Sequence, residues 1–271
     1  MARRIIIWGT AFIISLYLGS ILFLMKNQRV LQYTPGTKYV SLQSIDLPGA
    51  RLVNMPVDDL INVRGWFVPP KEGMPIIIFF KGNAGSFSED YPRYQEMSAK
   101  GYGVLAFDYR GFPLSPGEIT EEGILEDALA AFDWVSQNGA PIVLWGRSLG
   151  SAPALYVASL RDAEAVLLES PFTAAVDVAA ERYPIFPVNR LLKDQFLSRE
   201  WIGDVQEPIF VAHGTDDKTI SVQHGRDLYA LAPNGRELWI VEGGDHGSLW
   251  EDGIWEKAQE FFTEALAANA S

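Results

Sequence analysis

The sequence predicts an α/β fold with a mostly parallel central sheet and helices on both faces, preceded by one N-terminal transmembrane helix. Short apolar runs alternate with longer amphipathic segments over most of the chain, the pattern typical of parallel α/β sheets. One further apolar run near the N-terminus is long enough to cross a bilayer. The composition agrees, because 48% of the 271 residues are hydrophobic and 21% are charged, an ordinary globular balance.

The first element is the run from Ile5 to Met25, which contains no charged residue. As a helix it covers about 31 Å, enough to cross the hydrocarbon core of a bilayer. A cleaved signal peptide has a shorter apolar stretch followed by a small-residue cleavage site, and a buried core helix has a polar stripe. We therefore expect residues 1–25 to form an uncleaved single-pass anchor that takes no part in any chemistry.

The charges that flank this span orient it only weakly. Arg3, Arg4 and the amino terminus precede it, and Lys26 and Arg29 follow it. Because positive charges are retained on the inner side of a membrane, the balance favours an N-terminus inside and a main domain on the extracytoplasmic side.

The remaining chain is predicted to be one domain. Residues 26–36 form a polar connector that ends in a Pro-Gly turn, and residues 37–271 contain no repeat, low-complexity tract or second linker. Short runs of β-branched, aliphatic or aromatic residues predict strands at 39–47, 60–68, 75–80, 102–107, 141–145, 165–168, 208–212 and 237–241. Amphipathic segments predict helices at 87–100, 120–138, 149–160, 221–232 and 250–268.

Charge and composition exclude several classes of function. Acidic residues outnumber basic ones by 34 to 22, and a net charge of −12 argues against nucleic-acid partners. The chain has no cysteine and only 3 histidines, so disulfides, thiolate nucleophiles and cysteine or multi-histidine metal centres are not expected. We expect no metal and no cofactor, and the sequence does not indicate an oligomeric state.

A candidate nucleophile follows the predicted strand at 141–145. The residues Gly-Arg-Ser-Leu-Gly occupy positions 146–150, directly before a predicted helix, and place Ser148 at a strand-to-helix turn. Such a turn needs a glycine on each side of the serine because its strained backbone leaves no room for side chains there. An ordinary glycine-rich helix start is the alternative interpretation.

A serine nucleophile needs a base and an acid that orients the base. His246 lies in a glycine-rich loop after the last predicted strand and is our candidate base. His213 is expected to support the backbone of the acidic loop, and His224 falls inside a predicted helix, where a surface position is expected. Asp216 and Asp217 follow the strand at 208–212 and are both candidates for the acid.

An oxyanion formed at the serine needs two backbone amide donors. Leu149, the residue after the nucleophile, supplies one. The other is expected from the glycine-rich turn after the strand at 75–80, with Asn83 as the first candidate and Ala84 as the second.

Six motifs together resemble a known family. They are FKGNAGS (80–86), DYRGFPLSPG (108–117), GRSLG (146–150), ESPF (169–172), HGTDD (213–217) and GGDHG (243–247). In this order they resemble the α/β-hydrolase-domain serine hydrolases, in particular the membrane-anchored subgroup related to depalmitoylating thioesterases and lysophospholipases. The resemblance implies an α/β-hydrolase fold over residues 30–265, with Ser148 as nucleophile, His246 as base and Asp217, rather than Asp216, as acid.

The chain departs from the family pattern at two positions. Lys81 stands where the family usually has histidine, and Pro113 where it more often has glycine. Lys81 is interpreted either as a cation that attracts an anionic head group or as a solvated or ion-paired side chain. Asp108 and Arg110 are expected to tie a strand end to its loop.

The segment between Glu169 and Glu207 is too short for a large lid and predicts a short cap over the site. Its aromatic residues Phe172, Tyr183 and Phe186 either line a substrate groove or pack the cap onto the sheet. The sequence as a whole predicts a membrane-anchored serine hydrolase that cleaves an ester or thioester of a small molecule, lipid or acylated protein. A peptidase or amidase with the same triad is the enzymatic alternative, and a catalytically silent binding module is the alternative from another class.

Overall fold

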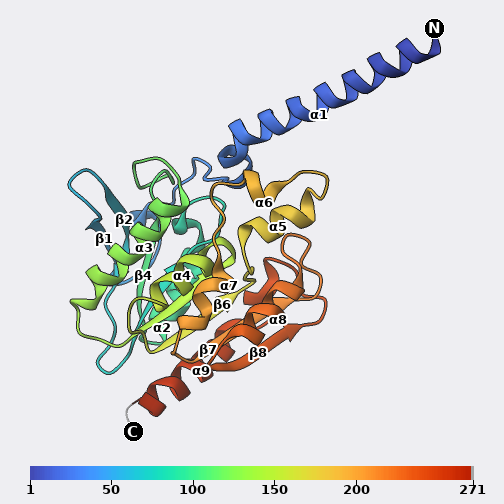
Figure 1. Cartoon of the computed structure of the whole chain (residues 1–271). Coiled ribbons are helices and arrows are strands. Elements are labelled where there is room, and N and C mark those ends of the chain that lie inside the picture. Colours follow the sequence, from blue (N-terminus) through green and yellow to red (C-terminus); the bar gives the residue numbers. More distant parts are fainter. Residues whose placement is uncertain (270–271) are drawn as a thin grey trace.

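The computed structural model describes residues 1–269 of the chain. Figure 1 shows one long helix that projects from a body in which helices cover a central sheet. The strands are β1 (Arg51–Pro56), β2 (Asn62–Val68), β3 (Ile76–Phe80), β4 (Gly103–Asp108), β5 (Ile142–Arg147), β6 (Ala165–Glu169), β7 (Ile209–Gly214) and β8 (Gly235–Val241). The α-helices are α1 (Ala2–Gln32), α2 (Tyr91–Ala99), α3 (Glu121–Ser136), α4 (Ser151–Ala158), α5 (Ala175–Arg182), α6 (Val188–Leu191), α7 (Ser198–Trp201), α8 (Val222–Leu231) and α9 (Ile254–Asn269). Short 3₁₀ turns lie at Leu42–Ser44, Phe87–Asp90, Ser148–Gly150, Ile202–Asp204 and Ser248–Trp250.

The strands form one mixed sheet in the order β1-β2-β4-β3-β5-β6-β7-β8. The pairs β1–β2 and β2–β4 are antiparallel, and the pairs from β4–β3 to β7–β8 are parallel. The chain proceeds from β3 to β4 on one side and then crosses to β5 on the other side. Sites in open α/β sheets form at such a reversal, outside the carboxyl ends of the strands. The sequence prediction of a mostly parallel α/β fold is therefore confirmed.

The two faces of the sheet bury two separate apolar cores. In β3, Ile76, Ile78 and Phe80 enter one core, and Ile77 and Phe79 enter the other. Helices α3, α4 and α8 contribute side chains to the first core, while α2 and α9 contribute to the second. A strand that is buried on both faces needs apolar residues at every position, which explains why this segment reads as an unbroken apolar run.

The predicted strand at 39–47 is wrong, because this segment contains a 3₁₀ turn at Leu42–Ser44 and no strand. One edge of the sheet is formed by β1 instead, a strand that was not predicted from the sequence. The following turn joins β1 and β2 tightly: Asp58 Oδ1 accepts the backbone N–H groups of Leu60 and Ile61, each at 2.7 Å. This local hairpin occupies the edge of β2, which leaves the segment before it without a strand partner.

Helix α1 is longer than the predicted anchor. It continues through residues 26–32, which the sequence analysis assigned to a connector, and ends where Tyr33 adopts an extended backbone. Neither proline nor glycine occurs between Gly19 and Pro35, so nothing in the sequence stops the helix at Met25. Among the described residues, α1 is the one helix long and apolar enough to cross a membrane.

The last two turns of α1 are attached to the body through Asp194. Arg29 Nε donates to Asp194 Oδ2 at 3.0 Å, and the hydroxyl of the buried Tyr33 donates to the same oxygen at 3.1 Å. The side-chain amide of Gln32 donates to the Asp194 carbonyl at 2.8 Å. We define the cap as residues 170–208, between β6 and β7, and it contains Asp194. Figure 1 shows its helices α5 and α6 beside the base of α1.

Candidate active site

Ser148 lies on a sharp turn between β5 and α4, with a φ of 52°. A residue other than glycine in this left-handed region costs roughly 1–3 kcal/mol, so the surrounding packing must impose it. A Cβ on Gly146 would lie 2.5 Å from the Gly150 carbonyl oxygen, and one on Gly150 would lie 2.0 Å from the Phe80 carbonyl oxygen. Both glycines of the motif are therefore required by close contacts of the backbone at this turn.

The structure brings three predicted residues into one hydrogen-bonded chain. The Ser148 hydroxyl donates to His246 Nε2 at 2.9 Å, and His246 Nδ1–H donates to Asp217 Oδ2 at 2.6 Å. The partners of the two ring nitrogens assign this tautomer. Asp216, the neighbouring acid, is exposed to solvent and points elsewhere, since successive side chains at a strand end diverge.

Asp217 is buried and accepts more hydrogen bonds than the one from His246. Its Oδ1 accepts the backbone N–H groups of Thr219 and Ile220 at 2.8 and 2.9 Å. His213 Nε2 lies 3.2 Å from Oδ2. Burial favours the neutral acid, but the hydrogen bonds from His213, His246 and Ile220 outweigh it and hold the pKa of Asp217 well below its usual value. The carboxylate is therefore charged at neutral pH.

The other two histidines are both buried. His213 Nε2 lies 3.0 Å from the Ile220 carbonyl oxygen, so His213 supports the acidic loop as the sequence suggested. The expectation that His224 lies on the surface is wrong. Its Nδ1 lies 2.8 Å from Thr173 Oγ1, because the cap folds over the helix face that the sequence left without a partner.

The loop that follows β3 lies beside the serine. A Cβ on Gly82 would lie 3.6 Å from Ser148 Cβ, and Gly82, Asn83 and Ala84 line the same cavity as Ser148 and Leu149. The amide of Leu149 belongs to the first turn of the helical segment after the nucleophile, where N–H groups have no intrahelical acceptor. Both predicted sources of oxyanion donors thus line the same cavity as Ser148.

This loop is tied to the end of α1. The side-chain amide of Asn83 donates to the Gln32 carbonyl at 2.6 Å, and the Gly85 amide donates to the Thr34 carbonyl at 3.1 Å. Thr34 and Ala84 also form an isolated parallel bridge. We call these three contacts the α1 tether. They indicate that the backbone after the predicted anchor positions the loop beside Ser148.

Lys81 is not the solvated side chain that one sequence interpretation expected, because it is buried. Its Nζ donates to the Gly82 carbonyl at 2.8 Å and lies 3.9 Å from the centre of the Phe112 ring. Burial lowers the pKa of Lys81 to about 8, against the attraction of Asp108. Cation–π contact and the carbonyl replace water around the ammonium group.

Two further charged residues of the motifs, Asp108 and Arg110, are structural. Asp108 is buried and accepts from the amides of Phe87 and Leu114 and from the Ser86 hydroxyl. Arg110 pairs with Asp127 through two side-chain hydrogen bonds of 2.9 and 2.7 Å. These contacts fix the loops after β3 and β4, as expected from the sequence.

A cavity of about 520 Å³ lies over Ser148. Phe172 and Tyr183 of the cap line it, and Phe172 also packs in the core, so the two interpretations of the cap aromatics both hold for this residue. Phe186 does not line this cavity; it borders a neighbouring groove. Among the described residues, no cluster of three histidine or acidic side chains is placed to hold a metal ion.

One wall of the cavity comes from α1, which the sequence analysis assigned to membrane anchoring alone. The lining residues from this helix are Leu24, Met25, Gln28, Leu31 and Gln32. Their spacing places them on one face of a helix, and this regular spacing, unbroken across Met25, is the signal that was available in the sequence. The expectation that residues 1–25 take no part in the chemistry stays a prediction, but the helix that contains them also contributes side chains to the cavity.

The fold and the serine–histidine–aspartate geometry define an α/β hydrolase, and residues 75–186 match the family model described as the alpha/beta hydrolase fold. The uncharacterized protein Rv2307c of Mycobacterium tuberculosis is 35% identical over 234 residues, which cover 84% of this chain and 83% of that protein. The chain therefore belongs to the α/β-hydrolase fold family.

More distant matches carry functional names. The lysophosphatidylserine lipase ABHD12 of Danio rerio is 33% identical over 187 residues, which cover 60% of this chain and 49% of that protein. Among solved structures, the Pyrococcus furiosus esterase Pf2001 aligns with a TM-score of 0.70 at 21% identity, covering 85% of this chain and 98% of that one. At this identity the structural match shows the fold alone.

Proposed function

We propose that this protein is a membrane-anchored serine hydrolase that cleaves a carboxylic ester or thioester of a lipid or another acylated substrate. The observation that carries the proposal is the chain of hydrogen bonds from Ser148 through His246 to the buried Asp217, set on a strained turn. The lysophosphatidylserine lipase ABHD12, which is similar in sequence, supports the same class of reaction.

In the proposed reaction Ser148 Oγ attacks the substrate carbonyl carbon while its proton passes to His246 Nε2. The negative charge of Asp217 stabilises the imidazolium that forms and keeps Nδ1–H directed toward the carboxylate. His246 then gives the proton to the departing alcohol or thiol, which leaves an acyl group on Ser148. Water attacks this acyl-enzyme with His246 again as base, which releases the carboxylic acid and restores the serine.

The oxyanion of each tetrahedral intermediate is assigned to the backbone amides of Leu149 and Asn83. Donors that are fixed before the reaction stabilise developing charge without reorganisation, and each typically contributes 10²- to 10³-fold to turnover. The α1 tether supports this role for Asn83, because it fixes the loop through the side chain and leaves the backbone amide available to substrate.

The cavity supports an acyl substrate. Its walls are mostly apolar, with Phe172, Val178 and Tyr183 from the cap and Leu24 and Leu31 from α1. Polar residues that include Asn83 and His246 line the same cavity as Ser148, as expected when an apolar chain must be held and one carbonyl oriented.

Membrane anchoring is proposed on the length and hydropathy of α1, whose apolar side chains are exposed over most of the helix. With Arg3, Arg4 and the amino terminus before the span, we assign the N-terminus to the inside and the catalytic domain to the extracytoplasmic side.

The test is a substrate panel with the purified full-length chain in lipid vesicles. The panel contains esters, thioesters and amides with matched acyl chains. The esters or the thioesters should be hydrolysed much faster than the amides. In Ser148→Ala every rate should fall by roughly 10³-fold or more, because triad members act as a unit. Turnover that survives in folded Ser148→Ala would exclude the mechanism.

A further inference from the structure

A second apolar groove runs between α1 and the cap beside the catalytic cavity. It has a volume of about 410 Å³, and its lining residues include Leu16, Gly19 and Leu24 from α1 and Tyr183 and Phe186 from the cap. Leu24 and Tyr183 line the catalytic cavity as well, so the two spaces meet at these side chains. The groove therefore connects the space over Ser148 with the second half of the apolar span, from Ser15 to Leu24.

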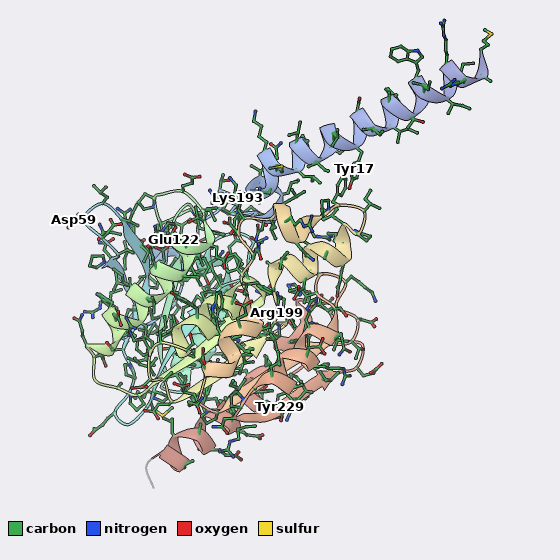
Figure 2. The ribbon with its side chains drawn as sticks, viewed as in Figure 1. Tyr17, Asp59, Glu122, Lys193, Arg199 and Tyr229 are labelled. Carbon is green, nitrogen blue, oxygen red and sulfur yellow. The ribbon has the colours of Figure 1, made fainter. Side chains whose placement is uncertain are left out.

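The cap is fixed against the span at this groove. The Tyr17 hydroxyl donates to the Ile185 carbonyl at 2.8 Å, and the Tyr17 and Phe186 rings stack with centroids 5.7 Å apart. Figure 2 shows Tyr17 directed from α1 toward the cap. Tyr17 lies about 12 Å along the helix axis from Met25, toward the middle of the apolar run. If the apolar run spans the bilayer, the part of the cap that contacts Tyr17 therefore lies within the depth of the hydrocarbon core.

The cap segment that contacts Tyr17 has a composition suited to contact with lipid. We call residues 183–188 (YPIFPV) the cap tip. It has no charged residue and includes two prolines, which have no N–H group to satisfy. Ile185 is 71% exposed, and its carbonyl, which lipid cannot hydrogen-bond, is paired with Tyr17. Arg182 and Arg190 flank the tip, as cations commonly flank apolar segments at a membrane surface.

We propose that the cap tip inserts into the bilayer and that the groove is the path and binding site for one acyl chain of a membrane lipid ester. The acyl chain lies along α1 between Leu16 and Leu24, and the ester carbonyl reaches Ser148 from the membrane–water interface. The substrate thus enters from the membrane rather than from the aqueous phase. This inference rests on the proposed hydrolase function and names the state of its substrate.

Two glycines of α1 allow a matched test. A Cβ on Gly19 or on Gly9 meets nothing within 4 Å, but only Gly19 lines the groove. Gly19→Trp places an indole in the path, whereas Gly9→Trp adds the same side chain outside it. The probes are methylumbelliferyl palmitate, which resides in vesicles, and methylumbelliferyl butyrate, which is water-soluble. They share one leaving group, and the full-length chain is reconstituted in phosphatidylcholine vesicles.

We expect the ratio of palmitate to butyrate turnover to fall about tenfold in Gly19→Trp, because each methylene excluded from apolar contact weakens binding. Gly9→Trp should keep the wild-type ratio. An unchanged ratio in Gly19→Trp would overturn the path while leaving the hydrolase assignment intact. Failure of the wild type to cleave either ester would instead refute the hydrolase assignment on which the path depends.

A second measurement tests the cap tip without relying on activity. The chain has no cysteine, so Ile185→Cys can carry a single polarity-sensitive fluorophore. The control is Leu60→Cys, on the β1–β2 turn, where the native side chain is 87% exposed. In vesicles, emission from position 185 should shift to the blue and be quenched by spin-labelled lipids, while position 60 should show neither effect. Equal, water-like emission at both positions would overturn the insertion of the tip.

Discussion

Asp217 is held in its charged form by four hydrogen-bond donors, two from histidines and two from backbone amides. Its role does not end with orienting His246, since His213 and the amides of the following turn also depend on the carboxylate. A buried acid with this many donors is fixed in position and cannot be replaced by its exposed neighbour. The side chain therefore links the acidic loop to the reacting group.

Exchanging each acid of this pair for its amide tests that assignment. Asp217→Asn should lower turnover by roughly 10³- to 10⁴-fold, because the imidazole loses its orienting acceptor and its cation is unpaired. Asp216→Asn is the matched control and should stay close to wild type, as its side chain is exposed. Steady-state kinetics on a soluble ester measure both. A larger loss in Asp216→Asn would reassign the acid.

Lys81 is a buried cation with a pKa of about 8, set mainly by burial. The pKa of an exposed lysine in the unfolded chain is 10.5. Between these values the unfolded chain binds more protons than the folded protein, so stability rises with pH through that window. Below about pH 8 both states hold the proton, and this contribution to stability no longer changes with pH.

Lys81→Met removes the titrating group. The unfolding free energy of the wild type minus that of the variant should therefore increase from about pH 8 to about pH 10.5, by at most about 1.4 kcal/mol per pH unit. Chemical denaturation in detergent at a series of pH values measures the difference. Lys100→Met, on the surface, controls for the loss of one positive charge. A difference that stays flat with pH would show that the ammonium group is hydrated in the folded protein.

At the scale of elements, the strands and helices beside the nucleophile could be read from sequence because their patterns are local. β3 is apolar at every position, and the glycines at 146 and 150 stand where backbone contacts of 2.5 and 2.0 Å exclude a Cβ. The strand β1 could not be read, since its alternation is short and its place on the sheet edge depends on the hairpin turn. The burial of His224 depends on the cap, which no local pattern reveals.

The extension of α1 changes what truncation should do. Removing residues 1–25 leaves Arg29, Gln32 and the α1 tether, so turnover of a soluble ester should remain close to that of the full-length chain. Removing residues 1–36 takes away the Gln32 and Thr34 carbonyls and should lower turnover by about 10²-fold, the typical cost of losing an oxyanion donor.

Because the longer deletion also removes the buried Tyr33, the full-length variant Asn83→Ala isolates the tether. It keeps the backbone amide and loses only the side-chain contact to Gln32. Its kcat should fall about tenfold with little change in KM, since the loop acts on the transition state rather than on binding. If both deletions and Asn83→Ala match the full-length chain, the tether has no part in positioning the loop.

At the scale of the whole molecule, a sheet reversal, a short cap and a long N-terminal helix meet at one place. The reversal between β3 and β5 brings the loop after β3 to Ser148, and the carboxyl ends of β7 and β8 lead into the loops of Asp217 and His246. This convergence was predictable, because parallel strands end at the same edge of a sheet. The shared helix face of Leu24, Met25 and Leu31 could be read from their spacing, but its place in the cavity wall could not, because contact between a span and a cap is a property of the tertiary structure.

The proposed activation of Ser148 by His246, which Asp217 orients, is tested by labelling with an active-site-directed fluorophosphonate. The probe reacts with activated serines, and intact-protein mass spectrometry of the full-length chain in detergent counts the groups added. We predict one phosphonyl group on the wild type and on Ser44→Ala, a surface serine control, and none on Ser148→Ala. Labelling of folded Ser148→Ala, or a folded wild type that stays unlabelled, would contradict the account.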